Sequence, residues 1–308
     1  MKIKKFNLEE DFNRLEAYLR LQYLKNKNMT SWLPQRFNDL VYRINKYEIH
    51  QGRKSSMDFI YIFENQDEII GCILPDGDAI YISIKEGYEN KFKEIVEYAE
   101  ANCQQLFSKN ENGSIDFLVI ANDSNVYKAD ALKEMGYRRD EVGDYDNCIY
   151  PQNYNPIIEL PEGYRIAYGD EITDEFAKWS ACSNGFHPDY EKDPNHIYNM
   201  SDYNGRKESH MYKDSFECMI VTEENDICSY CFVYVDKQTK SAFIEPVSTR
   251  EKYRHKGIGS AMLNSVAQKC KELGIEKCYV NSFDWRVKFY NAAGFTTEDT
   301  IGFWHKKI

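Results

Sequence analysis

The sequence predicts an α/β protein of two successive domains, each a twisted mixed β-sheet flanked by helices. Three observations lead to this prediction. At 308 residues the chain is long for one compact domain and sufficient for two of about 150 residues. Strands and helices follow the same order in both halves. Residues 150–156, YPQNYNP, combine prolines with amides as linkers do, so we place the boundary near residue 155, giving domains of 1–155 and 156–308.

Apolar residues recur at strand and helix spacing through the first half. The elements predicted there are a strand, a helix, two hairpin strands, a long helix and a further strand: 2–6, 11–24, 59–63, 69–74, 89–107 and 115–120. Phe12, Leu15 and Leu19 recur at the spacing of one helix face. Acidic and amide residues at 64–68 separate the two apolar runs and indicate a hairpin turn.

The second half repeats this order. Its predicted elements are a strand, a helix capped by Thr173, two hairpin strands, a long helix and a further strand: 164–168, 173 onward, 217–221, 227–235, 257–273 and 278–281. Each half then closes on a glycine, Gly136 or Gly294, at a position that ends a helix, because glycine tolerates the left-handed conformation required there.

A basic turn with two glycines distinguishes the second half. Residues 254–259, RHKGIG, lie between an apolar strand at 242–247 and an amphipathic helix at 260–273. A strand, a basic turn and a helix together present backbone N–H groups at a helix N-terminus, where the helix dipole also favours an anion. The order R-x-x-G-x-G differs from the dinucleotide and P-loop motifs, so the turn predicts a site for another kind of pyrophosphate.

Two motifs in this half carry a family resemblance. Residues 245–259, EPVSTREKYRHKGIG, resemble the acetyl-coenzyme A motif of the GCN5-related N-acetyltransferase (GNAT) superfamily. Residues 289–295, FYNAAGF, resemble the superfamily's closing signature, Y-x-x-x-G-F, at the expected distance after the helix. The resemblance is strong in the second half and weak in the first. It implies a tandem-domain member with an acetyl-CoA-binding catalytic domain at 156–308.

The first half differs where the chemistry is expected. In place of the basic turn it has residues 85–91, KEGYENK, with one glycine and two carboxylates that repel a pyrophosphate. Leu132 stands where the second half has Tyr290. We therefore interpret residues 1–155 as a degenerate GNAT-like domain that serves as a scaffold or as one wall of the substrate cleft.

The resemblance also implies how acetyl-CoA is held as cosubstrate. Backbone amides of Val247 and Thr249, on either side of Ser248, are expected to hold the pantetheine arm, and a strand bulge to aim an N–H at the thioester carbonyl. The residues expected around the pyrophosphate are those of the turn and first helical turn: His255, Lys256, Gly257, Ile258, Gly259 and Ser260. Arg254 either adds a charge-assisted contact or caps the turn, and Lys256 reaches toward the 3′-phosphate.

Two residues are the candidates for catalysis. Tyr290 matches the superfamily's tyrosine beside the coenzyme sulfur and is expected to donate a proton to the leaving thiolate, with a core aromatic as the alternative. Glu245 is the candidate base. It precedes Val247 by two residues, so strand alternation places both on one face. A carboxylate near a cleft can take a proton from an ammonium group. The alternative for Glu245 is a hydrogen bond to a neighbouring loop.

The loop before the final helix departs from the superfamily. The asparagine commonly found seven residues before the tyrosine is Phe283 here, and Asn281 is a candidate substitute or a turn-forming amide. Selectivity for the acceptor is expected in residues 180–190, a polar and aromatic segment broken by glycine and proline. His187 in this segment is a candidate second base or substrate ligand.

Bulk properties limit the classes of partner. A net charge of −11 disfavours nucleic acid and anionic membranes and permits a cationic amine. The nine cysteines lack disulfide or zinc spacing, and the remaining histidines lack metal-ligand spacing, so we expect reduced thiols and no metal. The N-terminus does not resemble a signal peptide, and no apolar stretch approaches membrane-spanning length. We expect a cytoplasmic protein.

Two hypotheses from different classes follow. The first is an N-acetyltransferase that transfers the acetyl group of acetyl-CoA to a primary amine of a small molecule or peptide, by direct attack in a ternary complex, in a monomer or homodimer. The second is a non-catalytic protein that binds acyl-CoA for regulation. Tyr290 and Glu245 discriminate between them, because a binding protein requires neither an acid nor a base.

Overall fold

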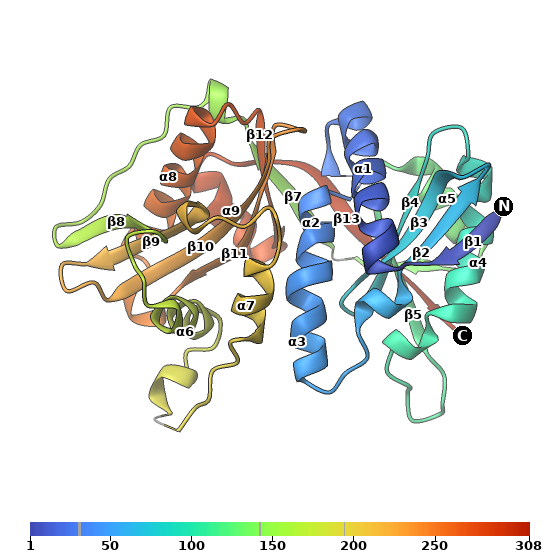
Figure 1. Ribbon diagram of the computed structural model, residues 1–308, viewed down its shortest axis with the longest axis horizontal. Coiled ribbons are helices and arrows are strands. Elements are labelled where there is room, and N and C mark those ends of the chain that lie inside the picture. Colours follow the sequence, from blue (N-terminus) through green and yellow to red (C-terminus); the bar gives the residue numbers. More distant parts are fainter. Residues whose placement is uncertain (30–31, 142, 194) are drawn as a thin grey trace. The chain divides into compact units, whose positions relative to one another are not determined.

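The computed structural model describes residues 1–29, 32–141, 143–193 and 195–308, which form two compact units (Figure 1). The first unit is Met1–Asp146 together with Asp299–Ile308, and the second is Asn147–Glu298. Each is a mixed β-sheet with helices, as the sequence predicts. The unit boundaries differ from the expected division at residue 155, because the C-terminal residues of the chain pair with a strand of the first unit.

Five strands and the end of the chain form the sheet of the first unit. Its helices and strands, in chain order, are β1 (Lys2–Lys5), α1 (Leu8–Asn26), α2 (Pro34–Asn38), α3 (Asn45–His50), β2 (Tyr61–Asn65), β3 (Glu68–Asp76), β4 (Ala79–Ile84), α4 (Phe92–Asn102), β5 (Asp116–Asn122), α5 (Val126–Glu134) and β6 (Arg138–Arg139). β7 (Asp144–Ile149) and β13 (Thr296–Lys307) contribute to both units. The strand order is β1-β2-β3-β4-β5-β13, antiparallel except for the parallel pair β4 and β5.

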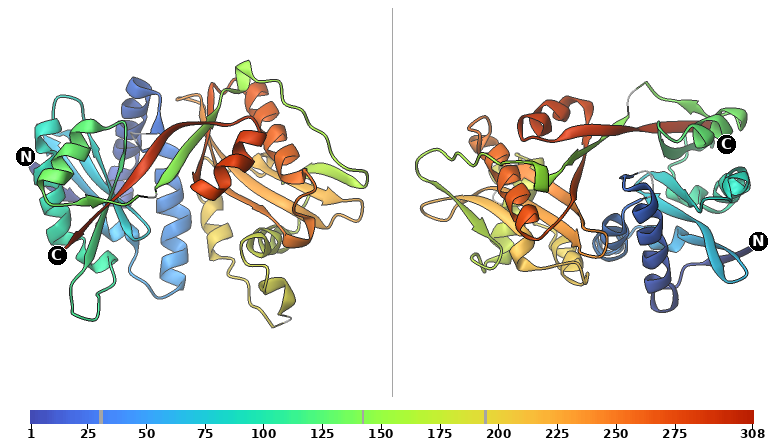
Figure 2. Two further views of the ribbon diagram at one scale, coloured as in Figure 1. Left: turned by 180° about the vertical axis from the view of Figure 1, so that it is seen from behind. Right: turned by 90° about the horizontal axis from the view of Figure 1, so that it is seen from above.

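The greater part of the C-terminal strand, from Asp299 onward, belongs to the first unit. Residues 301–307 of β13 pair antiparallel with residues 116–122 of β5 (Figure 2). Trp304 is almost completely buried in the core of this unit. The long predicted helix at 89–107 is shorter in the structure, where α4 ends at Asn102.

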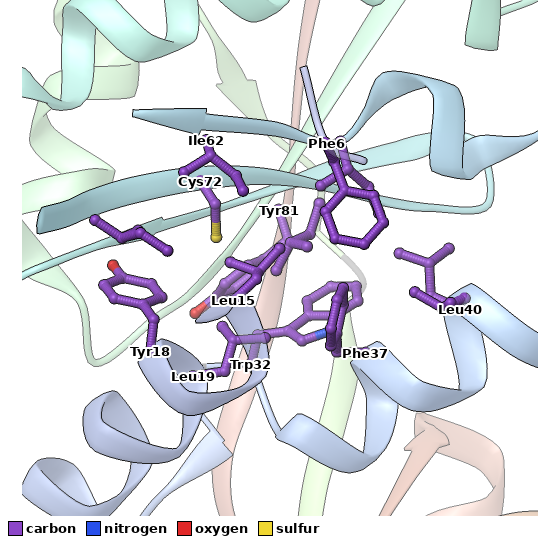
Figure 3. Packing of buried hydrophobic residues seen from close by; sticks show 14 of the residues in the cluster. Phe6, Leu15, Tyr18, Leu19, Trp32, Phe37, Leu40, Ile62, Cys72 and Tyr81 are labelled. Atoms are coloured by element: carbon purple, nitrogen blue, oxygen red, sulfur yellow. The ribbon is translucent and has the colours of Figure 1, made fainter. Parts of the chain in front are cut away.

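Helix α1 covers one face of the first sheet. It begins at Leu8, three residues before the predicted start, and the side chain of Asn7 accepts hydrogen bonds from the backbone N–H groups of Glu9 and Glu10. Leu15, Tyr18 and Leu19 point from the helix into a core that includes Ile62, Cys72 and Tyr81 of the strands (Figure 3). Burial of this apolar face holds the helix on the sheet.

The second unit repeats this construction. Its elements are β8 (Tyr164–Tyr168), α6 (Glu175–Phe186), α7 (Ser201–Lys207), β9 (Glu217–Thr222), β10 (Ile227–Asp236), β11 (Ser241–Thr249), α8 (Ile258–Glu272), β12 (Lys277–Phe283) and α9 (Asp284–Ala292). The strand order is β8-β9-β10-β11-β12, antiparallel except for the parallel pair β11 and β12. The predicted cap Thr173 is wrong by one residue, because Asp174 accepts the hydrogen bond from the N–H of Ala177.

The segment predicted as a linker is packed into the second unit. The hydroxyl of Tyr154 donates to Asn264 Oδ1 at 2.8 Å, and the amide of Gln152 donates to the carbonyls of Lys271 and Ile275. A Cβ on Gly294 would lie 2.4 Å from the ring of Tyr154, so the ring takes the space that this glycine leaves. This segment has the composition of a linker, but the side chains of Tyr154 and Gln152 pack it against the second unit.

Two irregularities of β11 position the candidate site. β11 and β12 pair only at 241–243 and 277–279, so the two strands separate toward their carboxyl ends. β11 also bulges against β10, because Cys231 pairs with Val247 whereas Val233 pairs with Ile244. One residue, Phe232, therefore faces two, Glu245 and Pro246.

Candidate active site

A cleft of about 620 Å³ lies in the second unit where β11 and β12 separate. The end of β11 and the turn after it form one side, and helix α9 forms another. The sequence-predicted residues that line it are Val247, Ser248, Thr249, Arg254, His255, Gly257, Ile258, Gly259, Ser260 and Tyr290. The cleft thus brings together the two motifs that are about 30 residues apart in sequence.

The basic turn leads directly into the N-terminus of helix α8. Together, residues 255–260 form the arrangement expected of an anion-binding site, here called the anion cradle. Gly257 precedes the helix with φ of 80°, His255 has φ of 62°, and no side chain caps the first turn. The helix has 15 residues, so its N-terminal N–H groups and dipole give the end of the cleft a positive potential. Backbone groups in this arrangement bind phosphate oxygens.

The two positions of the turn are glycine for different physical reasons. A Cβ on Gly257 would meet nothing within 4 Å, so this residue is glycine for its positive φ. A Cβ on Gly259 would lie 3.1 Å from the ring of Phe289 and 3.3 Å from Thr249 Oγ1. Gly259 therefore allows α8 to approach both α9 and β11, which closes the inner wall of the cleft.

Arg254 ties the turn to its surroundings. Its Nε donates to the carbonyl of Thr249 at 3.0 Å, and its Nη2 donates to the carbonyl of Gly185 at 2.7 Å. These bonds match the turn-capping alternative for this residue. Gly185 is the last residue but one of α6, and a Cβ there would lie 2.6 Å from the Cβ of Ser248. The arginine thus joins the end of α6, the end of β11 and the turn.

Tyr290 is the buried titratable group of the cleft. Its side chain is 4% exposed, and its ring lies 5.1 Å from that of Phe289, centroid to centroid. Burial raises the pKa of Tyr290, the carboxylate of Glu245 raises it further, and Arg286 opposes the increase. The phenol therefore keeps its proton at neutral pH, which is the state that a proton donor requires.

Glu245 lies beside the cleft, outside the group of residues that line it. Its side chain is partly buried, and its charge raises the pKa of both Tyr290 and Cys182. The expected common face with Val247 stays a prediction, because the bulge adds a residue to β11 between Ile244 and Val247. The carboxylate of Glu245 is electrostatically coupled to the phenol of Tyr290, although Glu245 is not among the residues that line the cleft.

Three other sequence candidates lie outside the cleft lining. Lys256 Nζ is 3.2 Å from the hydroxyl of Tyr164, to which it donates, and lies over the rings of Tyr164 and Tyr253. Asn281 is on β12 before the strand ends. The ring of His187 stacks on Tyr190 at 4.7 Å between centroids. Aromatic contacts hold the lysine and the histidine where they are.

Five further residues line the cleft that were not named individually as site residues from the sequence. They are Gly185, Tyr253, Trp285, Arg286 and Phe289. A signal exists for Trp285 and Arg286, which precede Phe289 and Tyr290 by four residues each, the spacing of neighbours on a helix face. Gly185 lies within residues 180–190, where selectivity for the acceptor is expected, and the close packing of α6 on β11 brings it to the cleft.

Other kinds of site were searched in the described part of the chain. Among residues 1–29, 32–141, 143–193 and 195–308, no group of three or more His, Cys, Asp or Glu side chains could hold a metal ion. Within the same residues, no helix has both the length and the apolar character needed to cross a membrane. The nine cysteines are all buried thiols.

Comparison with known proteins identifies a family match within the second unit. Residues 176–295 match the acetyltransferase (GNAT) family, a span that contains every residue lining the cleft. Among curated proteins, none matches the chain significantly.

Solved structures show the same fold over the whole chain. A GCN5-related N-acetyltransferase from Sphaerobacter thermophilus superposes with a TM-score of 0.61 at 16% identity, covering 89% of this chain and 93% of that one. A tandem GNAT protein from the clavulanic acid biosynthesis pathway gives 0.61 at 12% identity, covering 99% and 98%. A GNAT-family acetyltransferase from Colwellia psychrerythraea gives 0.56 at 11% identity, covering 99% of both. The second unit therefore contains a segment that matches the acetyltransferase (GNAT) family, and the chain has the fold of these GNAT structures.

Proposed function

We propose that this protein is an acetyl-CoA-dependent N-acetyltransferase whose acceptor is a primary amine of a small molecule or peptide. The observation that carries the proposal is the single cleft in which an anion cradle, the diverging end of β11 and a protonated, buried Tyr290 meet. Acetyl-CoA has a pyrophosphate, an extended amide arm and a thioester, and these three parts match the three features in order.

The backbone around the cleft supplies binding. The turn at residues 255–260 and the N-terminus of α8 would hold the pyrophosphate. Beyond residue 243 the edge of β11 that faces β12 is open, so Val247, Ser248 and Thr249 present backbone groups with which an extended amide arm can pair as a strand. The contacts of Arg254 with Thr249 and Gly185 hold this edge in position.

Two side chains supply proton transfer. The amine nitrogen attacks the thioester carbonyl carbon, a C–N bond forms, and the C–S bond breaks. Tyr290 gives its phenolic proton to the departing thiolate, and Glu245 takes a proton from the acceptor nitrogen through water, since its carboxylate lies beside the cleft. A fixed acid and base reduce the barrier because the negative charge on the departing thiolate and the positive charge on the acceptor nitrogen are both stabilised as they develop.

A non-catalytic acyl-CoA-binding protein is the second candidate. One observation favours it, namely that Glu245 is not among the residues lining the cleft. The cradle and the β11 edge serve binding equally well in either case. The catalytic proposal is preferred because the burial of Tyr290 keeps a proton donor inside the cleft, which binding does not require.

Release of free coenzyme A in the presence of acetyl-CoA and a broad panel of primary amines tests the proposal. We expect release that depends on one class of amine and an acetylated amine product by mass spectrometry. Coenzyme binding by calorimetry, with no amine-dependent release from any class, would support the binding protein instead.

A further inference from the structure

An exposed aromatic pair lies at the start of α9. The rings of Phe283 and Trp285 are stacked, with centroids 4.6 Å apart and an angle of 11° between the planes. Phe283 is 46% exposed and Trp285 is 67% exposed, and Trp285 lines the cleft. Large aromatic side chains left this open to water carry a hydrophobic cost, which a ligand that covers them would remove.

The topology of the sheet gives the end of the cleft at which this pair lies. β11 and β12 run parallel, pair at 241–243 and 277–279, and then separate. The turn at residues 254–259 follows the carboxyl end of β11, and Phe283 ends β12. Both therefore border the open end of the cleft. Tyr290 lies further along α9, and it is close enough to Glu245 for that carboxylate to raise its pKa.

This order fixes which part of the coenzyme reaches Trp285. With the thioester at Tyr290 and the pyrophosphate at the turn, the group that continues past the pyrophosphate at the open end is the adenosine. We propose that Trp285, supported from behind by Phe283, is the stacking surface for the adenine ring of the coenzyme. This inference rests on the proposed function, since it assumes that the cleft binds coenzyme A.

The chemistry of the neighbouring side chains fits that ligand. Purine rings stack on indole faces, and such stacking is insensitive to the pattern of hydrogen-bonding groups. Arg286, next in sequence, also lines the cleft and supplies a positive charge for a phosphate of the nucleotide. Because the chain carries a net charge of −11, this local positive charge offsets the repulsion that an anionic ligand meets.

Calorimetry on the full-length protein tests the proposal with coenzyme A and adenosine 3′,5′-bisphosphate as probes. For Trp285→Ala we expect a roughly tenfold higher Kd for both probes, the scale of one base stacked on an aromatic ring. Trp285→Phe should remain within about threefold of the unaltered protein, because it keeps a ring. Phe176→Ala, which removes an aromatic residue 54% exposed on α6 and outside the cleft lining, is the control and should leave both Kd values unchanged.

S-acetylpantetheine, which lacks the nucleotide, separates this subsite from the rest of the cleft. Trp285→Ala should leave kcat/KM for this short donor unchanged while lowering it for acetyl-CoA. Equal losses for both donors would overturn the adenine assignment and place Trp285 against the arm or the acceptor. Unchanged binding of coenzyme A by Trp285→Ala would also overturn it. Absence of binding to the unaltered protein would reject the proposed function itself, together with this inference.

Discussion

Lys128 Nζ donates a hydrogen bond of 2.8 Å to the backbone carbonyl of Ile82, inside the first unit. β4 and β5 pair at Ile80 and Tyr81 with residues 119 and 120, so this carbonyl lies just beyond the paired part of β4. Lys128 is the third residue of α5, as Arg286 is the third residue of α9. The lysine side chain, 3% exposed, thus stands at the helix position that Arg286, a residue of the cleft lining, has in the second unit.

The buried Lys128 should make stability depend on pH. Burial lowers the pKa of this amine to about 7 from an ordinary value of 10.5, so between these values the unfolded chain binds one more proton than the folded chain. Unfolding free energy should therefore rise with pH from about 7 toward 10. Lys128→Met should lose this rise, and its stability relative to the unaltered protein should be greatest below pH 7. Urea unfolding across this range measures the effect.

Lys133→Met is the matched control for this experiment, because Lys133 lies on the same helix with its side chain 64% exposed. It should follow the pH profile of the unaltered protein. Parallel profiles for Lys128→Met and the unaltered protein would show that the amine keeps its ordinary pKa in the folded state.

Gly257→Glu should abolish binding of acetyl-CoA. The substitution places a side chain at φ of 80° and adds a negative charge at the cradle. Gly274→Glu is the control, since Gly274 also has positive φ, meets nothing within 4 Å, and follows the opposite end of α8. A concentration-dependent rise in melting temperature on adding acetyl-CoA should persist in the control and vanish in Gly257→Glu. Persistence in both variants would contradict the cradle.

Tyr290→Phe should retain coenzyme affinity and lose turnover by about 10²-fold, the scale expected for assistance by one general acid. The phenyl ring keeps the packing against Phe289 and Phe295 while removing the proton. Tyr168→Phe, in a tyrosine of β8 outside the cleft lining, is the control and should keep the turnover of the unaltered protein. Coenzyme A release under saturating donor gives kcat for each variant. Equal turnover of Tyr290→Phe and the unaltered protein would remove the phenol from the mechanism.

Glu245→Gln should reduce the rate most at low pH. There the acceptor arrives as an ammonium ion and needs a base, whereas at high pH free amine is already present. The variant should therefore approach the rate of the unaltered protein as pH rises. If Glu245 is only structural, the variant should instead show a lower melting temperature with an unchanged shape of the pH profile.

Two fragments should differ in behaviour because of where the chain crosses between units. A fragment of residues 147–298 contains all the cleft residues and the contacts of Gln152 and Tyr154 with the second unit. It should fold and bind coenzyme A. A fragment of residues 156–308 lacks those contacts and carries the end of β13 without β5, an exposed strand edge, and should aggregate. Light scattering and calorimetry compare them, and equal solubility and affinity would contradict the unit boundaries.

Local sequence was sufficient to predict much of the fold and of the candidate site of this protein. The order of elements in the two halves follows from apolar periodicity, and the turn at residues 254–259 follows from its glycines and basic residues, because these signals are local in the chain. Tyr290 was predicted to join that turn from a second motif at fixed distance. The cleft lining contains most of the residues that the two motifs predict.

Tertiary structure decided what depends on contacts between distant residues. The pairing of β13 with β5 moved the end of the chain into the first unit, and the packing of Tyr154 on Gly294 turned a linker composition into part of the second. The bulge in β11 sets Phe232 of β10 opposite both Glu245 and Pro246, an irregularity that apolar periodicity along the chain does not reveal. The burial of Lys128 and the approach of Gly185 to Ser248 depend on how helices pack on sheets, which residue spacing along one chain does not specify.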